Sequence, residues 1–166
     1  MTRDLPRRLR RACAAVAAAC VTAGALVACG PAAVRADDVN ALRSVSDHLD
    51  ASASAVATAR LAVRARATGR LPSVTADATV AEAAETATGA VHGIGTLTVA
   101  GQDAAGAREK ALDAASGAVG PIAAVRTWLG GSPSAPDDVL RALDDAATAL
   151  DDADRMVRRT TGEVAP

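Results

Sequence analysis

Residues 137–157 read DDVLRALDDAATALDDADRMV, three units of seven residues that each begin with two aspartates. Apolar residues recur in this segment at alternating spacings of four and three, which is typical of a helix with one buried face. That face carries Val139, Leu143, Ala146, Leu150, Ala153 and Val157. The aspartate pairs then lie on the opposite, outermost face, as in the heptads of a coiled coil.

Two upstream segments have similar patterns. Residues 37–67 place large apolar residues seven apart, with a second stripe beside them, which predicts one long helix. The first stripe is Leu42, Leu49, Val56 and Val63, and the second is Val39, Val45, Ala53 and Ala59. Residues 77–99 are predicted to form a second helix, with Thr79 and Glu82 at capping-box spacing. Its last residues, 96–99, also fit a short strand.

A further helix is expected from Asp103 to Leu129, with Leu112, Ala115, Val119 and Ile122 on one face. Pro121 should kink or break it, because proline removes a hydrogen bond and clashes with the preceding turn. Four helices of similar length joined by short loops favour neighbours that run antiparallel. The sequence therefore predicts an all-α, up-down four-helix bundle.

The amino terminus has the features of an export signal. Residues 1–11 contain five arginines, and residues 12–28 contain no charge. The apolar run ends in Leu26-Val27-Ala28-Cys29, which resembles the lipobox of bacterial lipoprotein precursors. Cys20 is a weaker alternative, because the alanines before it lack the large aliphatic residue of that motif.

The resemblance implies cleavage before Cys29 and attachment of a diacylglyceryl group to its sulfur. Residues 1–28 would then be a signal peptide, 29–36 a lipidated terminus with a short tether, 37–160 the bundle and 161–166 a tail. The chain would be anchored by lipid at the extracytoplasmic face of the cell membrane.

Cleavage also changes the charge of the chain. It removes five of 18 basic and one of 19 acidic residues, leaving a net charge of about −5 and Cys29 as the remaining cysteine. A disulfide within the mature chain and a cysteine-based zinc site are thereby excluded. The acidic mature chain is not expected to bind nucleic acid, because such binding depends mainly on basic side chains that neutralise the phosphates. We expect no cofactor.

Two groups of residues are candidates for binding. His92, Gly93 and Trp128 could contact a ligand or partner, since glycines in the second helix leave a notch beside the histidine. The acidic face could attract divalent cations, although calcium normally requires a loop that gathers six to eight oxygens. That face carries Asp137, Asp138, Asp144, Asp145, Asp151 and Asp152.

No catalytic or phosphate-binding motif is found in the sequence. We therefore expect a non-enzymatic lipoprotein whose helical domain is a structural or interaction module of the cell envelope, with a protein partner there. One alternative is a bundle that binds a small ligand or lipid in a cavity beside His92, Gly93 and Trp128. Another is a sensor of divalent cations that uses the acidic face.

Overall fold

The computed structural model describes residues 31–162, and within this range it contains four helices and no strand. The helices are α2 (Pro31–Ala67), α3 (Ser73–Thr96), α4 (Gln102–Leu129) and α5 (Pro136–Thr161). The chain divides into two compact units, Met1–Asp37 and Asp38–Pro166, and the bundle belongs to the second. The predicted all-helical class and the number of helices are confirmed.

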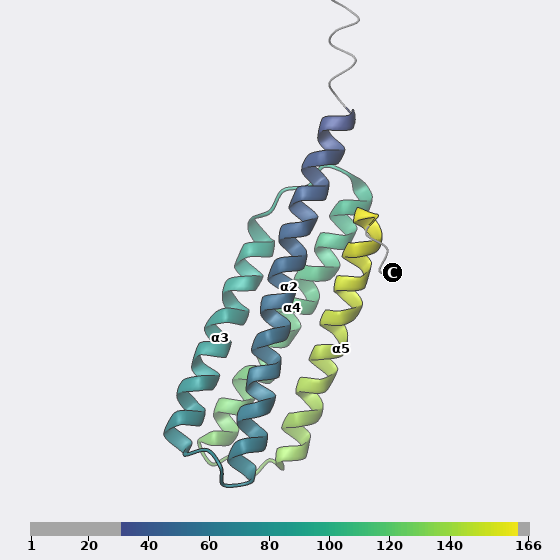
Figure 1. Cartoon of the computed structure of the whole chain (residues 1–166). Helices are drawn as coiled ribbons and strands as arrows, with labels where there is room; N and C mark the ends of the chain where they lie inside the picture. Colours follow the sequence, from purple (N-terminus) through teal and green to yellow (C-terminus); the bar gives the residue numbers. More distant parts are fainter. Residues whose placement is uncertain (1–30, 163–166) are drawn as a thin grey trace, which may run out of the picture. The chain divides into compact units, whose positions relative to one another are not determined.

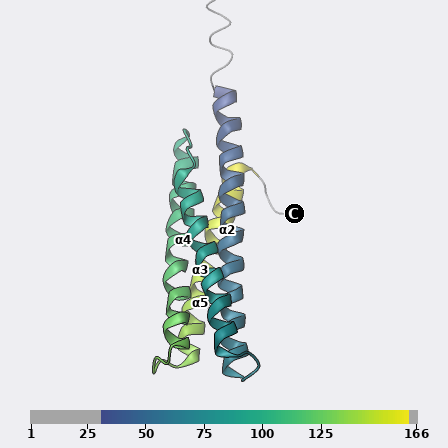
Figure 2. The same cartoon turned by 90° about the vertical axis from the view of Figure 1, so that its left-hand side faces the viewer.

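Within the bundle unit, Figures 1 and 2 show the four helices side by side, each beside the next helix in the chain. α5 also lies beside α2. Ser46 on α2 donates a hydrogen bond to Asp154 at 2.5 Å, and Arg60 pairs with Asp144 at 2.6 Å. Later residues of α2 therefore contact earlier residues of α5.

Later residues of α3 likewise contact earlier residues of α4. Arg108, near the start of α4, donates hydrogen bonds to the carbonyls of Ile94 and Gly95 at the end of α3. Arg126, near the end of α4, pairs with Asp77 in the first turns of α3 at 3.4 Å. These contacts place the α3–α4 connection and the α2–α3 connection at opposite ends of the bundle.

The fourth helix agrees with its heptad pattern. All six predicted seam residues of α5 are buried, and its buried set contains no others. Pro136 stands in the first turn, where its missing amide has no intrahelical partner to lose. Gly162 ends the helix with a φ of 78°, a left-handed conformation that glycine adopts without strain.

The third helix differs from its prediction. α4 runs without a break from Gln102 to Leu129, with Pro121 inside it. The carbonyl that would accept from residue 121 belongs to Gly117, which is exposed, so water can replace the missing bond. The predicted Leu112 and Val119 are only half-buried beside the core. The buried face of α4 is formed by Ala104, Ala107, Ala111, Ala115, Ala118, Ile122 and Val125.

The first two helices begin earlier than predicted. α2 starts at Pro31, so residues 31–36 are helical rather than an extended tether; they are mostly alanine, valine and arginine, and proline suits a first helical position. α3 starts at Ser73, and the Thr79 hydroxyl bonds the carbonyl of Thr75 instead of capping the helix. α3 ends at Thr96, so the short strand considered for 96–99 does not form.

The core is rich in alanine. Leu42, Leu49, Val56 and Val63 are buried as predicted, but Ala53 is exposed and Ser52 occupies the core instead. Alanine supplies about half of the buried apolar positions, which allows helix backbones to approach closely. Each such side chain removes little apolar surface from water, so the few buried leucines, isoleucines and valines supply much of the hydrophobic stabilisation.

Candidate functional site

The three residues predicted to line a ligand cavity do not come together. His92 is exposed on α3, while Trp128 is half-buried against the core at the end of α4. The end of α4 lies beside the start of α3, whereas Gly93 lies near the end of α3. His92 and Gly93 therefore lie near one end of the bundle and Trp128 near the other, so the three residues do not line one common cavity.

The notch at Gly93 is occupied by a side chain from α2. A Cβ built on Gly93 would lie 2.3 Å from both Cε1 and Nε2 of His48. The sequence places His48 between Asp47 and Asp50, which favours a position in solvent, yet it is half-buried against α3. Glycine at residue 93 leaves room for the imidazole, and a larger residue there would displace the ring.

The six aspartates of the acidic face are all exposed, as predicted. Several are engaged by arginines: Asp138 by Arg141, Asp151 and Asp152 by Arg155, and Asp144 by Arg60 of α2. Within residues 31–162, no three acidic, histidine or cysteine side chains are grouped so that they could hold a metal ion. A straight helix separates successive pairs by roughly 10 Å, which accounts for the absence of a cluster there.

The end of the bundle that contains the α3–α4 connection is held by two charged side chains. Asp38 of α2 accepts hydrogen bonds from the amides of Ala100 and Gly101, at 2.8 and 2.9 Å. Gly101 is the N-cap of α4, so a carboxylate from another helix satisfies the amide end of α4. Arg108 similarly donates to the carbonyl end of α3, where positive charge is favourable.

Sequence reasoning missed these contacts because they join residues far apart in the chain. In the sequence, Asp38 is distinguished only by its place near the start of the first helix, and Arg108 belongs to no local motif. The sequence gives a partial signal for the ion pair between Arg60 and Asp144. Arg60 interrupts an apolar stretch of the first predicted helix, directly after Ala59, which is predicted to be buried.

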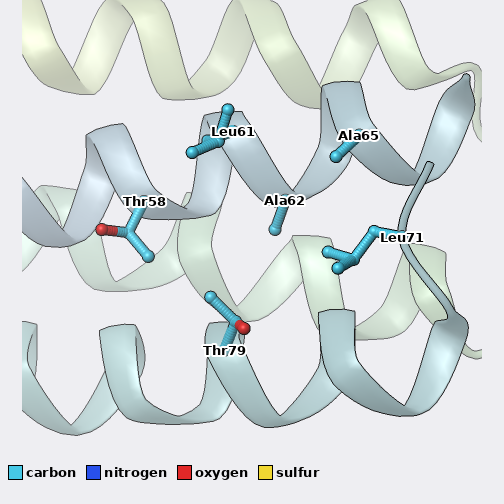
Figure 3. A pocket seen from close by; sticks show the side chains of 6 residues that line it. All are labelled: Thr58, Leu61, Ala62, Ala65, Leu71 and Thr79. Atoms are coloured by element: carbon cyan, nitrogen blue, oxygen red, sulfur yellow. The ribbon is translucent and has the colours of Figure 1, made fainter.

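A pocket of about 320 Å³ opens between α2 and α3 at the other end of the bundle. It is lined by Thr58, Leu61, Ala62, Ala65, Leu71 and Thr79. Figure 3 shows that α2 supplies four of these side chains, α3 supplies Thr79, and the connection between the two helices supplies Leu71. The lining carries no charge, and Leu61 is 69% exposed, so the pocket is an open apolar hollow.

Cys29 and the predicted signal peptide lie outside the described residues. Across 31–162, no helix combines the length and the hydrophobicity needed to cross a membrane. Comparison with known proteins finds no matching family model, no similar curated protein and no similar solved structure.

Proposed function

We propose that this chain is a bacterial lipoprotein, anchored at the extracytoplasmic face of the cell membrane through lipid on Cys29. The observation that carries the proposal is Leu26-Val27-Ala28-Cys29 at the end of an uncharged run that follows five arginines. Small residues before the cysteine let the backbone enter a membrane peptidase, and the thiol accepts the diacylglyceryl group. The arginines favour retention of the first residues in the cytoplasm and export of the rest.

The exported part acts as a non-enzymatic helical module that binds a protein of the envelope. An up-down, antiparallel course of the helices is supported by the paired contacts Ser46 with Asp154 and Arg60 with Asp144. The sequence has no catalytic motif, and the predicted site residues that lie within 31–162 do not come together in one place.

The short stretch of chain between Cys29 and the bundle sets which end of the bundle faces the membrane. Nine residues lead from Cys29 to Asp38, so Asp38 lies within about 30 Å of the lipidated residue. The α3–α4 connection, which Asp38 holds, is therefore at the membrane-facing end. The α2–α3 connection and the pocket beside it lie at the end directed away from the lipid.

Metabolic labelling with palmitate tests the anchor. The wild-type chain should incorporate label and sediment with membranes, and the Cys29→Ala variant should lose both properties. Cys20→Ala is the matched control, since it removes a thiol from the same apolar run and should label normally. Undiminished label on Cys29→Ala, or loss of label only with Cys20→Ala, would contradict the proposal.

A further inference from the structure

Arginines without acidic neighbours in the sequence lie around the end of α2 and the α2–α3 connection, beside the pocket. Residues 51–76 contain four arginines and no aspartate or glutamate, in a chain whose formal net charge is −1. Arg60 is bound to Asp144, but Arg64, Arg66 and Arg70 are exposed and form no ion pair with any residue in 31–162. These three, the distal arginines, therefore present unneutralised charge.

The distal arginines border the apolar pocket. Arg64 follows Leu61 by three residues and Arg66 follows Ala62 by four, so each lies one helical turn from the pocket lining. Arg70 directly precedes Leu71, whose side chain closes the pocket at the end of α2 (Figure 3). Asp77, the acidic residue nearest to Arg70 in the sequence, pairs with Arg126 of α4. The surface thus combines an uncharged hollow with a rim of free guanidinium groups.

We propose that this surface docks an acidic segment of a partner protein, with an aliphatic side chain of that segment seated in the pocket and its carboxylates on the distal arginines. Arginine pairs with carboxylates through two parallel hydrogen bonds, and it is frequent among the residues that dominate binding energy. The pocket, of about 320 Å³, is at the lower end of the range of ligand sites and is open to solvent at Leu61. It therefore suits a side chain of a bound segment better than a small molecule, which is normally enclosed.

Two other occupants fit the surface less well. In a second copy of this chain, Asp138, Asp144, Asp151 and Asp152 are already bound by arginines. Leu49, an aliphatic residue that stands between Asp47 and Asp50, is buried in the core and cannot enter the pocket of another copy. The membrane fits poorly because the pocket residues of α2, from Thr58 to Ala65, lie roughly 30–40 Å along the helix from Asp38, at 1.5 Å per residue. That second argument rests on the proposed anchor, since it assumes that Cys29 is the lipidated residue.

Photocrosslinking in cells of the source organism tests the proposal on the full-length chain. A benzophenone amino acid replaces Ser54, which is exposed one turn before Thr58, and a second strain carries it at the exposed Ala149 of α5 as a control. Mass spectrometry then identifies the crosslinked segment. We expect adducts from position 54 to a segment with aspartate or glutamate on both sides of an aliphatic residue.

The dependence of the crosslink yield on the distal arginines is tested in the strain that carries the benzophenone at position 54. Arg64→Gln, Arg66→Gln and Arg70→Gln together should lower the adduct yield at least tenfold. Arg141→Gln, Arg155→Gln and Arg159→Gln, which remove the same charge from α5, should leave it within twofold. Membrane fractionation of each variant keeps this test separate from that of the anchor, because all of them retain Cys29.

Four results would overturn the proposal. The first is the absence of a position-specific adduct in cells where the chain is membrane-bound, and the second is an adduct yield that does not depend on the distal arginines. The third is a crosslink from position 54 to lipid, and the fourth is a crosslink to a second copy of this chain.

Discussion

At the residue scale, the contact between Gly93 and His48 shows how one missing side chain shapes the bundle. The imidazole fills the space that a Cβ on residue 93 would need. At Gly89, one turn earlier in α3, no atom lies within 4 Å of the position that an added Cβ would take. The two glycines are therefore a natural pair for comparison, since both carry the same helix-propensity cost.

We expect Gly93→Ala to lower the free energy of unfolding by about 1 kcal/mol, because displacement of the His48 ring outweighs the gain in helix propensity. Gly89→Ala should raise it by about 0.5–1 kcal/mol. Urea unfolding followed by circular dichroism measures both values. In the His48→Ala background the penalty at Gly93 should vanish, and a penalty that persists would show that His48 is not its cause.

Asp38 provides a second test at this scale. Asp38→Ala removes the acceptor of two backbone hydrogen bonds and should cost about 1–2 kcal/mol of unfolding free energy. Hydrogen exchange at the amides of Ala100 and Gly101 should accelerate. Asp37→Ala, a change at an exposed neighbouring carboxylate, should stay within about 0.5 kcal/mol of wild type. Equal effects of the two substitutions would refute the capping role.

At the element scale, prediction succeeded where side-chain size followed the helical period. The buried face of α5 was predicted in full because leucine and valine recur there at the helical period opposite the aspartate pairs, which also fixes the positions of its two alanines. The buried face of α4 was predicted only in part, at Ala115 and Ile122, because it is mostly alanine, while the larger Leu112 and Val119 lie at its edge. Periodicity cannot separate a buried alanine from an exposed one in a chain where about a quarter of the residues are alanine.

The unbroken course of α4 leads to a prediction at Pro121. Pro121→Ala supplies an amide for the carbonyl of Gly117 and removes a ring clash, so it should raise the free energy of unfolding by about 1–3 kcal/mol. Thermal or urea denaturation measures the gain. A loss of stability would instead mean that the packing of α4 depends on the proline.

At the scale of the whole molecule, stability rests on few large side chains. Leu143→Ala truncates a fully buried residue and should cost about 2–5 kcal/mol, a large fraction of the total for a domain of this size. Met156→Ala, on the same helix at a position that is 40% exposed, should cost less than about 1 kcal/mol. Comparable losses in urea unfolding would contradict the assignment of the α5 seam.

The sequence was sufficient to predict the number of helices and the seam of α5, whereas the polar contacts between helices required the structure. Asp38, His48 and Arg108 meet partners 13 to 63 positions away, and no local pattern encodes such pairs. The proposed anchor is a different case, because the motif at Cys29 is contiguous in the sequence and its chemistry would be local.

The central claim is that the mature chain begins at Cys29 and carries lipid there. Intact-mass spectrometry of the protein purified from membranes of its own cells tests it most directly. We predict the mass of residues 29–166 plus a thioether-linked diacylglyceryl group, with or without an amide-linked acyl chain. A chain that still begins at Met1, or one that carries a free thiol at position 29, would contradict the account.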